Sequence, residues 1–383
     1  MSSKELITAN HFRNLFFKNT PFLDVRAEGE YAKGCFPNST NFPILNDHER
    51  HLVGVCYKQK GQQAAIELGH QLVCGESKNT RIQNWCESAA SNPNTHIYCW
   101  RGGMRSNLAQ QWMHDVGIDV PLIEGGYKAL RRSLIEVIDE AASNTRMIRI
   151  GGKTGVAKSC LISEIPESID LERYANHRGS SFGRMVSAQP TQANFEHALA
   201  IDLLHASDIT HTDKTLFVED ESKNIGAISI PLAFYDAMRQ SQILLVEMPL
   251  EFRIQQILKE YVIEMTVSFE SQYPENGFEI FSLYLNDSLQ RVQKRLGLER
   301  YKEIAQLLAS ALHSHAHTGN VQGHEAWIAR LIADYYDPMY EYQLSKKQDL
   351  VIFRGNYEEA LEWALDFDNS RLSSPNNPMP KQL

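Results

Sequence analysis

The sequence predicts an α/β protein of two domains, each built on a parallel sheet, with a large helical portion in the second. Short apolar runs alternate with helical stretches, which is typical of parallel strands joined by crossover helices. A cysteine-containing loop and a glycine-rich loop each follow one of these runs and precede a helix. At 383 residues the chain is too long for one ordinary core, and a usual domain length of roughly 100 to 200 residues favours two domains.

The first domain is expected to span residues 12–140. Its apolar runs predict strands at 21–25, 95–99 and 121–123. Helical spacing is found at 58–73, 81–90, 107–116 and 129–142.

The second domain is expected at residues 145–365, after a break at 143–145. Its predicted strands lie at 147–150, 216–218, 243–247 and 350–353. Most of the sequence between 249 and 347 has helical character. The tail at 366–383 is rich in Pro, Asn and Ser, so we expect it to be disordered.

The composition is that of an ordinary globular protein. No run approaches the ~18 apolar residues of a membrane span, and the first residues lack the order of a signal peptide, so we expect a cytoplasmic protein without a membrane partner. The 6 cysteines show neither CxxC pairing nor metal-ligand spacing, which predicts free thiols and no metal site. A net charge of −9 argues weakly against a nucleic-acid partner, although a local basic face can still bind RNA.

Cys99 stands at the end of a predicted strand and before a helix. Gly102 and Gly103 let the intervening loop curl, so that backbone N–H groups can point inward and, with Arg101 and Arg105, bind an anion. Such surroundings favour the reactive thiolate. A lone cysteine is most often a small buried residue, but the strand, the glycines, the arginines and the helix together favour a chemical role for Cys99.

The segments 22–31 (FLDVRAEGEY) and 34–43 (GCFPNSTNFP) resemble the opening of a rhodanese domain, and with the Cys99 loop the likeness covers about residues 12–140. The spacing from Cys99 to Arg105 also resembles the Cys-x5-Arg loop of cysteine phosphatases, although Tyr98 stands where that signature usually has His. A loop one residue longer than the common sulfurtransferase loop suits a larger anion, such as selenophosphate.

Residues 151–159 (GGKTGVAKS) follow a predicted strand and precede a helix, the context that a Walker A loop requires. Lys158 would contact terminal phosphates, and Ser159 could hold Mg²⁺. The loop is shaped by Gly152, Thr154 and Gly155.

Ala157 replaces the second glycine of the G-x-x-x-x-G-K-[ST] pattern, which puts the binding and hydrolysis of ATP or GTP in doubt. The segment 216–221 (LFVEDE) could supply an acidic strand end near the phosphates, with Asp220 as its metal-side carboxylate. A solvated strand end is an equally good interpretation of that segment.

Five longer strings resemble one family as a whole. They lie at 57–65, 99–106, 125–131, 176–183 and 334–340. They are similar to tRNA 2-selenouridine synthases, over nearly the whole chain except the tail. The resemblance implies an enzyme that converts 2-thiouridine at wobble position 34 of tRNA to 2-selenouridine.

The same resemblance implies two steps, S-geranylation of the thiocarbonyl with geranyl diphosphate and then exchange of the S-geranyl group for selenium from selenophosphate. Cys99 would be the selenium carrier or nucleophile, and the loop of Arg101, Gly102, Gly103 and Arg105 would bind its anion. Gly152, Thr154, Gly155, Lys158 and Ser159 would bind the diphosphate. Both small molecules would be substrates, and no tightly bound cofactor is implied.

Two basic groups are candidates for tRNA binding. Lys128, Arg131 and Arg132 fall at i, i+3 and i+4 and would form one basic helix face. Arg178 and Arg184 flank a Ser- and Gly-rich loop suited to phosphate contact. Each group could equally be a solvated surface.

Three alternatives remain open. The chain could be a rhodanese-type sulfurtransferase or a cysteine phosphatase fused to a phosphate-loop domain. It could also be a non-catalytic RNA-binding module whose loops only hold phosphates.

Overall fold

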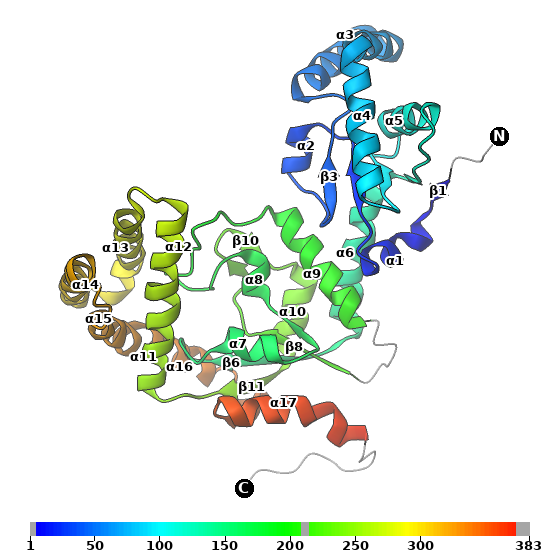
Figure 1. The fold of residues 1–383 in the computed structure, drawn as a ribbon. Coiled ribbons are helices and arrows are strands. Elements are labelled where there is room, and N and C mark those ends of the chain that lie inside the picture. Colours follow the sequence, from blue (N-terminus) through cyan, green and yellow to red (C-terminus); the bar gives the residue numbers. More distant parts are fainter. Residues whose placement is uncertain (1–4, 208–213, 373–383) are drawn as a thin grey trace. The chain divides into compact units, whose positions relative to one another are not determined.

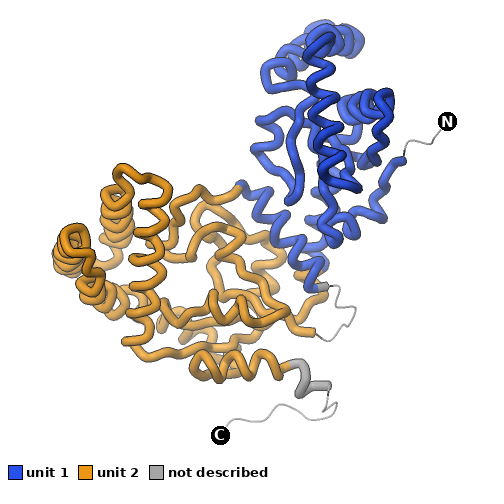
Figure 2. Tube along the Cα trace, in the orientation of Figure 1, with its two compact units in different colours: residues 1–140, 191–208 blue, residues 141–190, 209–383 orange. Residues whose placement is uncertain are grey.

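The computed structural model describes residues 5–207 and 214–372 (Figure 1). The chain divides into two compact units, unit 1 (Met1–Glu140 and Thr191–Asp208) and unit 2 (Ala141–Pro190 and Ile209–Leu383) (Figure 2). Each unit contains a parallel five-stranded sheet, which confirms the α/β class. Within the described residues, no helix is both long and apolar enough to cross a membrane.

Unit 1 is built on a sheet with the strand order β1-β5-β4-β2-β3, and every neighbouring pair runs parallel. Its strands are β1 (Leu6–Ile7), β2 (Phe22–Asp24), β3 (Ser39–Asn41), β4 (His96–Tyr98) and β5 (Leu122–Ile123). Its helices are η1 (Ala9–His11), α1 (Phe12–Phe17), α2 (Glu28–Ala32), α3 (Asp47–Leu72), α4 (Gly75–Ser91), α5 (Met104–Asp115), α6 (Gly126–Asn144) and α9 (Gln192–Ser207). The predicted strands β2, β4 and β5 are confirmed, whereas β1 and β3 were not expected. β3 consists of the polar residues STN and therefore shows no apolar run.

Gly61 divides α3 into two helical segments, 47–60 and 62–72. Its backbone angles of φ +85° and ψ −177° lie outside the helical region and are readily reached by glycine. The expected helix at 58–73 spans this break. Its first residues, including Lys58, belong to the segment before Gly61, and the rest belong to the segment after it.

Helix α9 packs in unit 1 although its neighbours in sequence belong to unit 2. Asn194 Oδ1 accepts the backbone N–H of Cys35 at 2.8 Å, and Arg131 forms an ion pair with Glu196 at 2.5 Å. The fully buried His197 packs its ring 4.5 Å from that of Phe36. Helix α9 therefore lies in unit 1, whereas the expected second domain of 145–365 spanned it.

Unit 2 is built on a sheet with the order β12-β11-β6-β8-β7, again parallel throughout. Its strands are β6 (Arg146–Gly152), β7 (Ser168–Ile169), β8 (Thr215–Glu219), β11 (Gln242–Val246) and β12 (Val351–Gly355), with a separate hairpin of β9 (Asn224–Ile225) and β10 (Ile228–Ser229). Helices among its strands are α7 (Lys158–Glu164), α8 (Leu171–Ala175) and α10 (Leu232–Gln240), and α17 (Tyr357–Leu372) follows the sheet.

The large helical portion of unit 2 lies between β11 and β12, as expected. It comprises α11 (Leu250–Ile257), α12 (Glu264–Gln272), α13 (Gly277–Leu296), α14 (Leu298–Thr318), α15 (His324–Leu331) and α16 (Asp337–Ser345), with the π-helices η2 (Leu258–Ile263) and η3 (Ile332–Tyr336) and the 3-10 helix η4 (Gln348–Leu350). Its own apolar core includes Phe281, Leu285 and Trp327.

The expected disordered tail starts inside α17, so residues 366–372 are helical instead. Phe367 explains why, since its ring lies 4.5 Å from Trp363 and 6.4 Å from Phe217. Residues 373–383 lie outside the described part of the chain.

Ala157 adopts a left-handed conformation at the start of α7, with φ +64° and ψ +38°. For an L-residue this conformation costs roughly 1–2 kcal/mol. The loop thus keeps the backbone shape that a glycine would favour, in spite of the alanine methyl group.

We expect the stability of the protein to fall between pH 7 and pH 5 through His197. Arg131 can only donate to Nε2 (3.3 Å), so Nδ1 carries the proton and donates to the Cys35 carbonyl (2.8 Å). Burial lowers the pKa of His197 from 6.5 to about 3. The folded-state pKa of His197 lies below its pKa of about 6.5 in the unfolded chain. Its stabilising contribution is therefore complete above pH 6.5 and is lost as the pH falls, because the unfolded chain takes up a proton there. The loss amounts to about 2 kcal/mol at pH 5.

Urea unfolding of the parent and of His197→Asn at both pH values measures this effect. The stability advantage of the parent should shrink by about that amount at pH 5, because Asn does not titrate. His205→Asn, at an exposed position of the same helix, is the matched control. An advantage that is independent of pH would contradict the assignment.

Ala157→Gly should stabilise unit 2 by about 1 kcal/mol, since glycine reaches positive φ without the Cβ penalty. The control Ala309→Gly, at an exposed position inside α14, should destabilise by about the same amount. Thermal unfolding checks the opposite signs of the two changes. A lower melting temperature for Ala157→Gly would show that the left-handed conformation carries no strain.

Candidate functional site

The Cys99 loop connects the end of β4 to α5 and is held by the start of α6. The backbone N–H of Tyr127 donates to the Cys99 carbonyl at 2.8 Å, and that of Lys128 donates to the Trp100 carbonyl at 3.1 Å. Gly126 has φ +60°, and a Cβ on it would lie 2.2 Å from the Cys99 carbonyl oxygen. A side chain at position 126 is therefore excluded, because the Cys99 loop passes against it.

Ser106 faces the sulfur of Cys99. Its buried hydroxyl donates to Cys99 Sγ at 3.2 Å. The first turn of α5 also leaves its backbone N–H groups without helical partners, and these suit an anion. Sequence reasoning missed Ser106, although it directly follows Arg105 in a Cys-x5-Arg-Ser string.

Arg105 is held by Glu30 rather than left free to meet an anion. Its Nη1 lies 2.5 Å from Glu30 Oε2, and Arg50 reaches the same oxygen at 3.0 Å. Burial raises the pKa of Glu30, but the Arg105 and Arg50 charges outweigh it and hold that pKa below its ordinary value. Arg101, in contrast, is exposed, while Gly102 takes φ +62° and packs against the backbone of residues 123–126.

A buried arginine lies beneath the loop. Arg26 is fully buried, and its Nη2 donates to Asp24 Oδ2 at 2.6 Å and to the Gly34 carbonyl at 2.8 Å. Its guanidinium lies 3.9 Å from the centre of the Tyr127 ring, on which Trp100 stacks at 5.2 Å. The aromatic pair thus positions the loop from its other side.

The phosphate loop of unit 2 connects β6 to α7. Gly152 passes so close to Val246 that a Cβ would lie 2.8 Å from the Val246 carbonyl oxygen, and Gly155 has φ +86°. Lys158 Nζ donates to the Gly152 carbonyl at 3.3 Å, which folds the lysine back over the loop. Ser159 is the second residue of α7 and is partly buried.

Asp337 holds this loop in place. Its carboxylate accepts two hydrogen bonds from the buried Arg253, at 2.5 and 2.9 Å, and lies 3.4 Å from Lys153 Nζ. Arg253 Nε in turn donates to the Thr154 carbonyl at 2.8 Å. Asp337 belongs to the string 334–340, one of those that carry the family resemblance.

Carboxyl groups gather beside Lys158. Glu219 is fully buried, its Oε2 accepts the backbone N–H of Glu172 at 3.0 Å, and its Oε1 has no partner within the described residues. A Cβ on Gly179 would lie within 3 Å of both Glu172 and Glu221 oxygens.

Burial, and then the neighbouring carboxylates, raise the pKa values of Glu172 and Glu219 well above their ordinary range, against the lowering effect of Lys158. Burial thus opposes ionisation of these carboxyl groups, and any of them that is ionised would compete with an anion for Lys158.

Asp220 does not join this group. It pairs with the buried Arg149 at 2.7 Å and with Lys347 at 3.1 Å. Because Asp220 is paired with two cationic side chains, its contacts do not favour the expected role as a metal-side carboxylate. Across residues 5–207 and 214–372, no group of three His, Cys, Asp or Glu side chains is arranged to hold a metal ion.

Lys128, Arg131 and Arg132 lie together, as their spacing predicted. They line a hollow of about 420 Å³ in unit 1, which Lys33 and Trp100 also line. Lys128 and Arg132 are exposed, whereas Arg131 is tied to Glu196.

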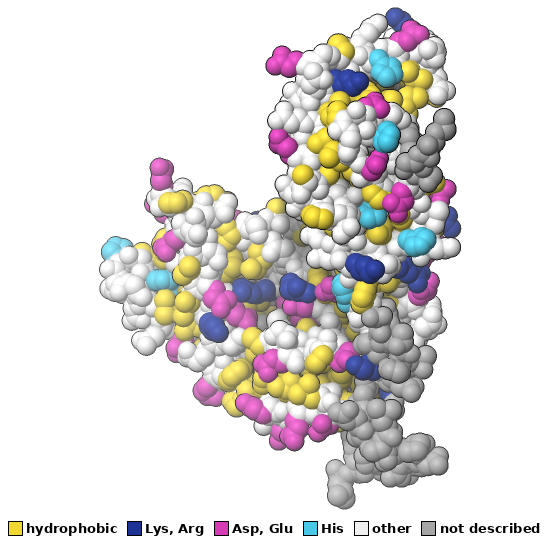
Figure 3. All heavy atoms as spheres, turned by 45° about the vertical axis from the view of Figure 1, so that its right-hand side comes forward, with side chains coloured by type: hydrophobic (Ala, Val, Ile, Leu, Met, Phe, Trp, Pro, Cys, Tyr) yellow, Lys and Arg dark blue, Asp and Glu magenta, His cyan; other side chains and the backbone are white. Residues whose placement is uncertain are grey.

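In unit 2, Arg178 donates hydrogen bonds to the Glu260 carbonyl at 2.6 Å and to the Glu264 carboxylate at 3.1 Å. Its guanidinium is therefore already paired inside the fold. Arg184 is exposed. On the face drawn in Figure 3, basic and acidic side chains are interspersed, so a surface for RNA has to be local.

Both halves of the chain match families of known proteins. Residues 8–133 match the rhodanese-like domain family, and residues 145–370 match the tRNA 2-selenouridine synthase AAA domain family. Curated relatives named tRNA 2-selenouridine synthase include that of Photobacterium profundum, 46% identical with 93% of this chain and 97% of the relative covered. That of Psychromonas ingrahamii is 45% identical, with 95% and 98% covered.

A third relative of the same name, from Pseudomonas paraeruginosa, is 47% identical over 92% of this chain and 96% of its own. Matches of this length extend through both units of the chain. The chain belongs to the tRNA 2-selenouridine synthase family.

Proposed function

We propose that this protein converts 2-thiouridine at the wobble position of tRNA to 2-selenouridine, in the cytoplasm. The observation that carries the proposal is the contact of Ser106 with the Cys99 sulfur in an anion-type loop. It is supported by a second anion loop around Lys158 and by the names of the relatives. Two anion sites suit a reaction with two anionic co-substrates.

The first step is S-alkylation by geranyl diphosphate. The sulfur of 2-thiouridine attacks C1 of the geranyl group, the C1–O bond breaks, diphosphate leaves, and N3 of the base loses its proton. Lys158 and the N–H groups at the start of α7 stabilise the leaving diphosphate. Mg²⁺, held by Ser159 and the diphosphate, would add positive charge there.

The second step uses Cys99 as a nucleophile on selenophosphate. The thiolate attacks phosphorus, the P–Se bond breaks, and hydrogen selenide is released beside the base. Its selenium attacks C2, the C2–S bond breaks, and geranyl thiolate leaves while the selenium proton passes to N3. Water then splits the S–P bond, which regenerates the Cys99 thiolate and yields phosphate. The proton released by the water is taken up by the geranyl thiolate.

The second candidate is a cysteine phosphatase, which the Cys99–Ser106 contact also favours because a hydroxyl donor stabilises a thiolate leaving group. Release of phosphate from simple phosphomonoesters, at a rate that 2-thiouridine tRNA does not change, would favour this candidate. The proposed function requires selenium in the RNA product.

Cys99→Ser should abolish selenium incorporation and leave S-geranylation intact, because a serine hydroxyl is not ionised at neutral pH. Nucleoside mass spectrometry of 2-thiouridine tRNA, incubated with geranyl diphosphate and selenophosphate, checks both products. Full 2-selenouridine formation by this variant would remove Cys99 from the mechanism.

Lys158→Ala is the matching variant for the other step. It should fail to geranylate but still introduce selenium into RNA that already carries S-geranyl-2-thiouridine. Normal geranylation would make the phosphate loop a structural element only.

Binding of tRNA should depend strongly on salt through the basic hollow beside Trp100. Replacing both Lys128 and Arg132 by Glu should make the slope of log K against log salt less steep by about two. Each phosphate that the protein neutralises contributes roughly 0.9 to the steepness of that slope. The same charge change at Arg300 and Lys302, exposed on α14, is the control. A filter-binding titration with equal slopes for both double variants would place the RNA site elsewhere.

A further inference from the structure

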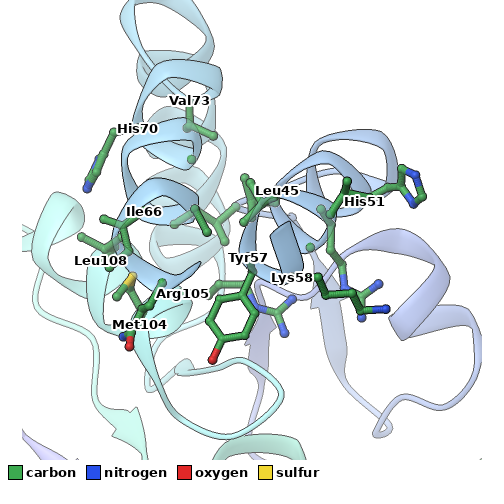
Figure 4. A pocket seen from close by; sticks show the side chains of 18 of the residues that line it. Leu45, His51, Tyr57, Lys58, Ile66, His70, Val73, Met104, Arg105 and Leu108 are labelled. Carbon is green, nitrogen blue, oxygen red and sulfur yellow. The ribbon is translucent and has the colours of Figure 1, made fainter. Parts of the chain in front are cut away.

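Unit 1 contains a groove that the chemistry above does not use. It has a volume of about 560 Å³, within the range of small-molecule sites, and lies between the two segments of α3 and the start of α5 (Figure 4). Its walls are mostly apolar. They include Leu45, Val53, Val55, Ile66, Val73 and Leu108.

Residues on both sides of the break at Gly61 line the groove. Figure 4 shows Tyr57 and Lys58 from the first segment of α3, and Ile66 from the second, with Met104 of α5 below Ile66. Several of the apolar side chains are exposed, with Tyr57 at 57% and Met104 at 47%. Exposed apolar surface in a concave site marks a place for an apolar ligand.

The groove adjoins the Cys99 loop. Met104 and Arg105 line it, and the next residue, Ser106, donates to the Cys99 sulfur. Its charged lining residues are Lys58 and the two arginines that pair with Glu30, Arg50 and Arg105, and none of the described residues that line it is acidic. The groove therefore suits an apolar group attached to a polyanion such as RNA.

We propose that this groove binds the prenyl chain of S-geranylated tRNA while the geranyl thiolate leaves C2. This inference rests on the proposed function, in which a ten-carbon chain must be present when selenium reaches the base. Burial of each methylene group strengthens binding roughly fourfold. The groove thus selects geranylated RNA over unmodified RNA for the selenium step.

Gly54 allows a direct test. It is exposed on α3 and lines the groove, and a Cβ built on it meets no atom within 4 Å. Gly54→Phe fills the groove, whereas Gly54→Ala adds only a methyl group. Both replace a glycine inside a helix, so both variants should be at least as stable as the parent.

The assay compares selenium incorporation into anticodon stem-loops that carry S-geranyl- or S-methyl-2-thiouridine. Gly54→Phe should lower kcat/KM for the geranyl RNA about tenfold, through KM, and leave the methyl RNA unchanged. Gly54→Ala should match the parent with both. Equal losses for the two RNAs, or no loss, would overturn the proposal.

Calorimetric titration with S-geranyl-2-thiouridine nucleoside separates this proposal from the proposed function. The parent should bind it more tightly than 2-thiouridine, and Gly54→Phe should lose that preference. If the parent transfers no selenium yet shows this binding pattern, the proposed function is wrong, whereas the binding of the geranyl chain in the groove is supported. An equal affinity of the parent for both nucleosides would remove the groove.

Discussion

The buried ion pair of Asp24 and Arg26 is the interaction on which unit 1 depends. Both side chains are fully buried, so neither charge can be compensated by water. Burial lowers the pKa of Arg26, but the Asp24 carboxylate more than offsets it and raises that pKa. Removing one partner of such a pair typically costs about 3–5 kcal/mol. Because Arg26 supports Tyr127, whose N–H holds the Cys99 carbonyl, the position of the sulfur follows from this pair.

Unit 2 uses the same kind of device. Arg253 is buried against Asp337 and holds the Thr154 carbonyl, as Arg26 is buried against Asp24 and supports the Cys99 loop. In both units an arginine fixed by a carboxylate keeps a curled loop in one conformation. A preorganised loop loses little conformational freedom on binding, which favours affinity for small anions.

The strands with strong apolar runs could be predicted from the sequence, and so could the two loops that follow them. The acidic strand end at 216–221 was expected near the phosphate loop, and its Glu219 and Glu221 lie beside Lys158. Glu172 could not be predicted there, because it is far from them in the chain and meets them only through the fold. The break at Gly61 was hidden by good helical sequence on both sides. Ala157 departs from the glycine of the sequence pattern, yet its backbone adopts the left-handed conformation that a glycine would favour.

Helix α9 has a consequence for the chain as a whole. Since Thr191–Asp208 belongs to unit 1, the polypeptide passes between the units three times instead of once. A cut near residue 140 would therefore separate the first unit from the helix that buries Phe36 and satisfies the backbone of Cys35. The two halves are not modules that recombination could exchange at a single junction.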